Sequence, residues 1–174
     1  MAIQAGTYKL GPDNASLTVE TGRSGAAAKA GHDLVIDVTS WEATLDVGDS
    51  SSLELSADPT SLHVREGQGG MQALKDDDKA DIRKTIDKDV LKKKGIAFKS
   101  SSVESAGDGL KVSGDLDLGG KTNPISFDLS ESAGTLRGSA TVTQSEWGIK
   151  PYSALFGALK VNDEVKVVVE AKLG

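Results

Sequence analysis

Residues 109–129 read GLKVSGDLDLGGKTNPISFDL and contain two segments in which apolar and polar residues alternate. A period of two predicts a strand that is half buried in an antiparallel sheet. The run from Gly119 to Pro124 between the segments has the composition of a turn, so we expect a β-hairpin. The apolar positions are Leu110, Val112, Leu116 and Leu118 in the first segment and Ile125, Phe127 and Leu129 in the second.

The same alternation recurs along the chain and predicts about nine strands in all. One long strand is expected over residues 26–38, and it would point His32 toward the core. A break is expected near Ser145 or Glu146, and a short helix or loop over residues 151–159. Further strands are expected at 6–10, 16–21, 41–47, 53–57, 62–64, 95–103, 136–142 and 161–173.

The period changes between Asp76 and Lys94. This stretch is rich in charge and carries Ile82, Ile86 and Val90 four residues apart, which predicts one amphipathic helix that ends at Gly95. Many short strands with a single helix indicate a mainly β protein, and its length suits one domain over residues 1–174. We favour an antiparallel barrel, because closure removes exposed strand edges.

Composition excludes several classes of function. The net charge is -6 and the basic residues are scattered, so nucleic acid is not an expected partner. No cysteine is present, and His32 and His63 lie far apart without a carboxylate pattern, so we expect no metal, no cofactor and no catalytic site. We also expect no membrane insertion, and a cytoplasmic location unless a leader has been removed.

The inward positions of the predicted strands are often small, which leaves room for an apolar cavity. These small residues are Ala26, Ala28, Ala30, Ala43, Ala57, Gly114, Gly138 and Ala140. A fully packed core is the alternative. His32 is the polar group among the lining positions, and it would bond either a ligand or the backbone. The candidate lining residues are His32, Leu34, Ile36, Trp41, Phe98, Leu116, Phe127, Trp147, Tyr152 and Phe156.

Four segments, in this order and spacing, carry a family resemblance. They are GHDL at Gly31 to Leu34, the helix end Asp87 to Leu91, the hairpin Gly114 to Leu129, and SEWGI at Ser145 to Ile149. The chain resembles the YceI-like family of polyisoprenoid-binding, lipocalin-like proteins.

The resemblance implies an antiparallel barrel of about eight strands with a helix packed on it. It also implies a long isoprenoid or other amphiphilic lipid in the interior, carried or sequestered, and no catalytic residues. Many members carry a leader, whereas we expect none at the start of this sequence. A ligand-free structural or stress-related barrel with a packed core is the alternative function, and a homodimer is left open.

Overall fold

The computed structural model describes residues 3–154 and 157–173. Most of the chain forms one antiparallel sheet of eleven strands, in the order β1-β5-β6-β8-β9-β10-β11-β14-β2-β4-β7. These strands are β1 (Gly6–Leu10), β2 (Ala15–Glu20), β4 (Asp33–Val38), β5 (Trp41–Val47), β6 (Ser52–Ala57), β7 (Leu62–Gln68), β8 (Ile96–Ala106), β9 (Gly109–Leu118), β10 (Lys121–Ser132), β11 (Thr135–Thr143) and β14 (Glu164–Lys172).

A smaller sheet joins β12 (Ser153–Ala154), β13 (Leu159–Val161) and β3 (Arg23–Ser24) in that order. The α-helix is α1 (Asp76–Thr85), which continues as a π-helical turn, η3 (Ile86–Val90). The described residues also include three 3-10 turns, η1 (Ala28–Ala30), η2 (Pro59–Ser61) and η4 (Gln144–Trp147).

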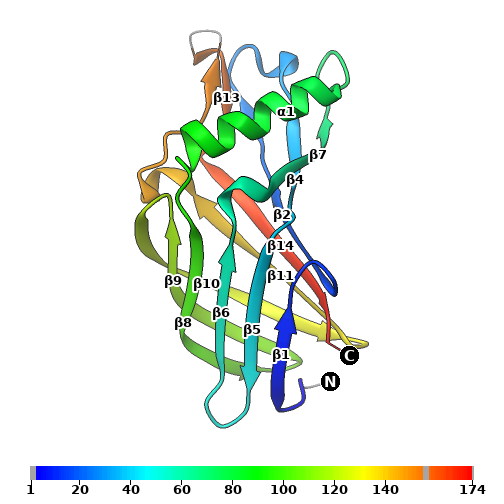
Figure 1. Ribbon diagram of the computed structural model, residues 1–174, viewed down its shortest axis with the longest axis vertical. Coiled ribbons are helices and arrows are strands. Elements are labelled where there is room, and N and C mark those ends of the chain that lie inside the picture. The colour runs from blue at the N-terminus through cyan, green and yellow to red at the C-terminus, as the bar shows by residue number, and fades with distance from the viewer. Residues whose placement is uncertain (1–2, 155–156, 174) are drawn as a thin grey trace.

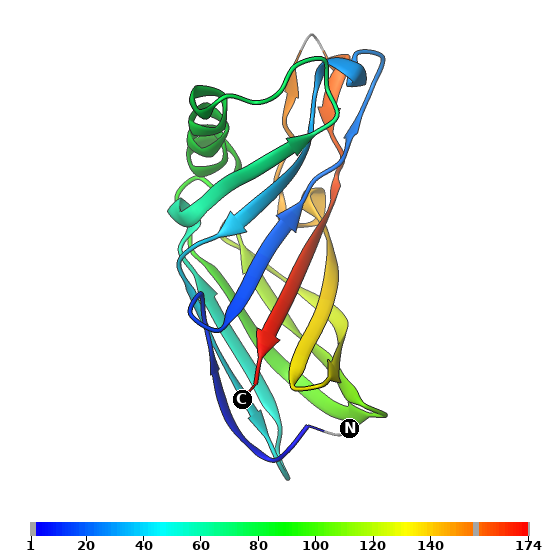
Figure 2. The same ribbon diagram turned by 90° about the vertical axis from the view of Figure 1, so that its right-hand side faces the viewer.

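The large sheet curls around an elongated interior, and α1 lies across one end of it, at the top of Figure 1. The described chain begins and ends toward the other end, and the quarter-turn view shows α1 beside the edge strand β7 (Figure 2). The edges of the sheet are β1 and β7. The predicted fold class is confirmed: a curled, lipocalin-like antiparallel sheet with one α-helix. The large sheet has eleven strands, more than the roughly nine that the alternation predicts and the roughly eight that the family resemblance implies.

The predicted hairpin is confirmed as β9 and β10, with Leu110 opposite Leu129 and Leu118 opposite Lys121. Its turn is shorter than expected. Only Gly119 and Gly120 form it, both with positive φ (62° and 86°), which glycine adopts without steric cost. Pro124 therefore lies within β10 rather than in the turn.

The prediction of one long strand over residues 26–38 was wrong. Residues 28–30 form η1, and β4 begins only at Asp33. The reason is tertiary: Gly25 has a φ of +102°, and a Cβ at Gly31 would lie 2.6 Å from the side chain of Leu159. The chain thus folds against the β13 segment there instead of extending.

Two further boundaries differ from the predictions, and one predicted break is confirmed. The helix leaves its regular path before Lys94, because Lys92 and Lys93 adopt left-handed φ values of 53° and 57°. The expected break near Ser145 is present as η4, and Gly148 ends it with a φ of 70°. Within the expected helix or loop over residues 151–159, residues 151–152 are loop, whereas β12 and the first residue of β13 form short strands.

Candidate ligand-binding site

The interior of the curled sheet contains a cavity of about 560 Å³. Most strands of the sheet, together with α1 and η3, contribute side chains to its wall, and most of these are Leu, Ile, Val or Ala. Its size lies within the range of ligand pockets, about 300–1,000 Å³. Leu45, Val112 and Leu136 are almost fully buried, and Leu45 and Leu136 also border the cavity, so the interior as a whole is not filled.

Eight of the ten predicted lining residues border the cavity: His32, Leu34, Ile36, Trp41, Phe98, Leu116, Phe127 and Tyr152. Six of them lie on strands, where alternation explains the placement because inward residues of a curled sheet face one interior. His32 and Tyr152 lie outside the strands. Phe98 and Phe127 lie against each other with ring centroids 5.5 Å apart and planes at 56°. A role for these residues in binding stays a prediction.

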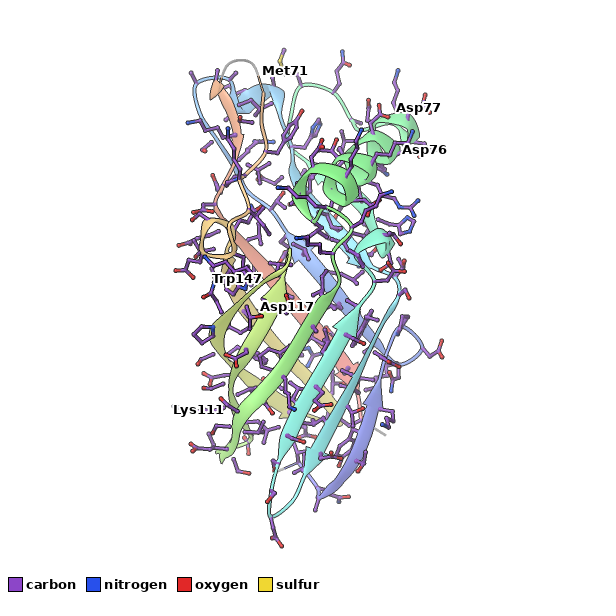
Figure 3. The ribbon with its side chains drawn as sticks, turned by 60° about the vertical axis from the view of Figure 1, so that its left-hand side comes forward. Met71, Asp76, Asp77, Lys111, Asp117 and Trp147 are labelled. Carbon is purple, nitrogen blue, oxygen red and sulfur yellow. The ribbon has the colours of Figure 1, made fainter. Side chains whose placement is uncertain are left out.

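Trp147 is not part of the cavity wall. The residue is 2% exposed, and its Nε1 donates a hydrogen bond of 2.8 Å to the carbonyl oxygen of Leu116. Trp147 is labelled in Figure 3. Because the indole bonds the backbone of β9 and does not border the cavity, Trp147 has the position of a structural residue. Phe156, the tenth predicted residue, lies outside the described residues.

The small residues divide into two groups. Ala30, Ala43, Ala57, Gly138 and Ala140 border the cavity, as their parity predicted. Ala26, Ala28 and Gly114 do not. A Cβ at Gly114 would lie 2.3 Å from the carbonyl oxygen of Lys99, where the pairing of β8 with β9 shifts register. Gly114 therefore permits close backbone contact and does not enlarge the interior.

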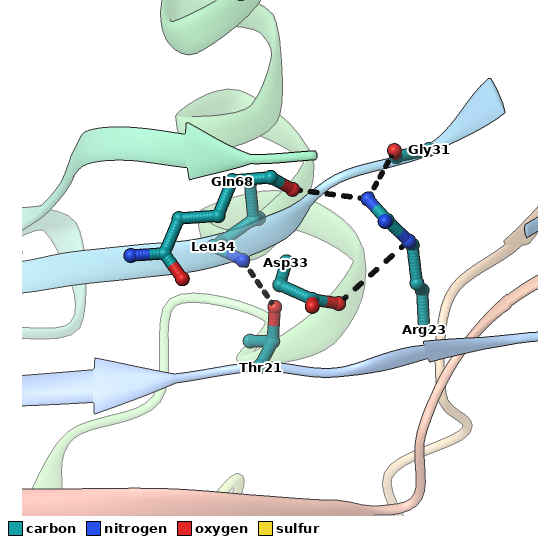
Figure 4. Close-up of polar contacts among 6 residues, drawn as sticks. All are labelled: Thr21, Arg23, Gly31, Asp33, Leu34 and Gln68. Carbon is teal, nitrogen blue, oxygen red and sulfur yellow. Dashed lines mark hydrogen bonds and ion pairs between the residues drawn. The ribbon is translucent and has the colours of Figure 1, made fainter. Parts of the chain in front are cut away.

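Polar groups gather at one end of the cavity, around Arg23 (Figure 4). Its Nη1 donates to the carbonyl oxygens of Gly31 at 2.5 Å and Gln68 at 3.0 Å, and its Nε lies 3.9 Å from the carboxylate of Asp33. Arg23 extends the parity of the inward positions of β2, and that pattern could have revealed it. The sequence reasoning stopped at residue 21 and missed it.

The glycine-rich segment 67–70 packs directly on this polar group. A Cβ at Gly69 would lie 2.4 Å from Nη2 of Arg23, and one at Gly70 would lie 2.5 Å from Nε2 of His32. The same His32 nitrogen is 2.6 Å from the carbonyl oxygen of Gln72 and donates to it. His32 thus takes the backbone bond that the sequence reasoning held open, while its ring still borders the cavity.

Helix α1 covers part of the cavity with Ile82 and Thr85. Two basic side chains hold it to neighbouring backbone. Nε and Nη2 of Arg83 donate to the carbonyl oxygen of Thr60 at 3.2 and 3.0 Å, and Nζ of Lys79 donates to that of Arg65 at 3.2 Å. The apolar face of the predicted helix therefore contributes to the cavity wall, and its charged face contributes the tethers.

Two side chains outside the cavity wall have a shifted pKa. Thr60 donates its hydroxyl and its amide to Asp58, and these bonds lower the pKa of that carboxyl. The Asp37 carboxylate, which accepts bonds from the Arg65 guanidinium, raises the pKa of Arg65. Neither Asp58 nor Arg65 borders the cavity. In the described ranges no three His, Asp or Glu side chains form a metal-binding group.

Comparison with protein families matches residues 8–173 to the YceI-like domain. The chain belongs to the YceI-like family. Proteins of this family bind polyisoprenoid lipids and are in general binding proteins rather than enzymes. The resemblance inferred from the four sequence segments is therefore confirmed.

Among solved structures, this YceI-like chain is similar to BcnA of Burkholderia cenocepacia. The two share 13% sequence identity with a TM-score of 0.63, and the likeness covers 90% of this chain and 94% of BcnA. At that identity the likeness concerns the fold. A search among curated proteins gives no match. Over the described part of the chain, no helix is both long and apolar enough to span a bilayer.

Proposed function

We propose that this protein binds a long-chain isoprenoid or a similar amphiphilic lipid in its cavity and carries or sequesters it. The observation that supports this most is the cavity itself, about 560 Å³ with a mainly aliphatic wall. An interior that is not filled by its own side chains is expected where a ligand completes the packing. The family's polyisoprenoid binding agrees with a ligand of this class.

Burial of the tail would supply most of the affinity. Each methylene group removed from water contributes roughly 0.8 kcal/mol, so selectivity should favour chains that fill the cavity. Because the wall offers few polar groups along most of its length, the tail would carry no polar substituent inside.

The polar head would lie at the end where Arg23, His32, Lys160 and Tyr152 border the cavity. Tyr152 is 51% exposed, so this end meets solvent and could leave a head group hydrated. The guanidinium, ammonium, phenol and imidazole groups there are hydrogen-bond donors, which suits a head with oxygen acceptors.

The first test is chemical. Native protein is extracted with organic solvent and the extract is identified by mass spectrometry, and delipidated protein is titrated with cis-parinaric acid, a fluorescent lipid, and with farnesol as competitor. We expect an extracted amphiphile and saturable uptake. A clean blank together with no uptake contradicts the proposal.

The second test fills the cavity. Ala57 on β6 borders it, while its neighbour Ser56 is exposed on the outer face. Ala57→Phe should therefore weaken binding on the order of tenfold, about 1.4 kcal/mol, and Ser56→Phe should leave it unchanged. Equal affinities for the two variants would indicate that the probe binds elsewhere on the protein.

A further inference from the structure

The wall of the sheet is split between β10 and β11. β10 pairs with β9 from Lys121 to Ser130, but it pairs with β11 only over its last residues, Asp128 to Ser132. β11 runs on to Thr143 with its pairs to β14 intact. Residues 121–127 of β10 and 140–143 of β11 thus flank a stretch of wall in which the two strands form no ladder.

The sequence of β10 explains why pairing stops there. Pro124 has no N–H to donate, and a proline is tolerated in a strand where one side lacks a partner. Above the split, Nδ2 of Asn123 donates to the carbonyl oxygen of Glu146 at 2.6 Å and ties β10 to η4. The split is therefore closed at both ends, by the pair Asp128 with Ser139 below and by this bond above.

The cavity reaches this split from inside. Ser139 is exposed and points outward by its parity on β11, yet it borders the cavity as well as a shallow hollow on the outer face. The cavity and the hollow share five residues of their walls: Phe127, Gly138, Ser139, Ala140 and Val169. Apart from Phe127, this shared wall therefore contains only small and medium side chains between the interior and the outer face.

We propose that this split is a side opening of the cavity through which the tail of an amphiphile enters and leaves, and that Phe127 gates it. The inference rests on the proposed function. Phe127 is half buried and contacts Phe98, a buried cavity residue on β8 that does not border the outer hollow. Its ring is the largest side chain in the shared wall, so its rotation changes the width of the opening most.

The first experiment measures exchange rates of cis-parinaric acid by stopped flow. Phe127→Ala, and the milder Phe127→Leu as a safeguard for folding, should raise the association and dissociation rates together, roughly tenfold for alanine, with a smaller change in Kd. The matched control is Trp41→Leu, which removes an aromatic ring from the cavity wall on β5, away from the split and from the outer hollow. It should change Kd and leave the association rate near that of the wild type.

The second experiment uses the absence of native cysteine. Ser139→Cys places a thiol in the shared wall, and Ser130→Cys places one in the outer hollow alone. A bulky maleimide on the first variant should slow exchange of the probe several-fold, and the same label on the second should not.

The outcomes separate the two proposals. Uptake by the wild type with unchanged rates in Phe127→Ala and in labelled Ser139→Cys would overturn the side opening and leave the proposed function standing. No uptake by the wild type would overturn the proposed function itself.

Discussion

The indole Nε1 of Trp147 donates a 2.8 Å hydrogen bond to the carbonyl oxygen of Leu116 inside the protein. The bond joins η4 to β9 across 31 positions of sequence. Trp41 offers a natural comparison, because its Nε1 is buried without a hydrogen-bond partner in the described structure. One tryptophan thus uses its polar atom to hold two elements together, and the other contributes only its ring.

Replacement of the two tryptophans by phenylalanine should have unequal effects. Trp147→Phe leaves the Leu116 carbonyl without its donor and should lower the free energy of unfolding by about 1–3 kcal/mol more than Trp41→Phe, which removes no bond. Urea unfolding of both variants, followed by circular dichroism, measures the difference. Equal losses would show that ring volume alone matters at position 147.

Arg83→Met should loosen helix α1. The change removes both donors to the Thr60 carbonyl, while methionine keeps much of the aliphatic stem. We expect faster amide hydrogen exchange over residues 76–90, with a loss of about 1 kcal/mol in global stability. Lys84→Met, on an exposed position of the same helix, is the control and should leave exchange unaltered. Unchanged exchange in Arg83→Met would mean that Ile82 and its apolar neighbours alone hold the helix.

Arg23→Met should be more costly than a typical arginine substitution at the surface. Arg23 donates to two carbonyl oxygens, those of Gly31 and Gln68, and hydrogen bonds from charged donors contribute about 1.5–3 kcal/mol. Arg137→Met is the control, since the exposed Arg137 makes an ion pair of 3.3 Å with Glu170, a kind worth about 0–1 kcal/mol. Thermal unfolding measures the loss of stability in the two variants. A similar decrease in Tm for both would show that the two hydrogen bonds of Arg23 contribute no more than the surface ion pair.

Asp58 should give a small acid-dependent contribution to stability. Thr60 lowers its pKa in the folded state, so its carboxylate stabilises the fold above the unfolded pKa of about 3.9. That contribution is lost as the pH falls through the still lower folded pKa. The stability difference between the wild type and Asp58→Ala should therefore be constant above about pH 5 and shrink in more acidic solution. A difference that grows on acidification would contradict this sign.

The local alternation of residues determined much of the fold. It predicted β1, β5, β6 and the hairpin of β9 and β10, because consecutive side chains of a strand point to opposite faces of the sheet. The same parity identified seven cavity residues, and it would have reached Arg23 had it been followed past residue 21.

Only the tertiary structure decided the rest, because those features depend on contacts between segments far apart in sequence. The sequence alone does not show that Gly31 packs against Leu159 or that Trp147 bonds Leu116, because these contacts form only when the strands have paired. The sequence determined that one face of each strand is apolar. The curvature of the sheet and the volumes of side chains that meet from distant strands decided that these faces enclose a cavity, and that its wall is split beside Pro124.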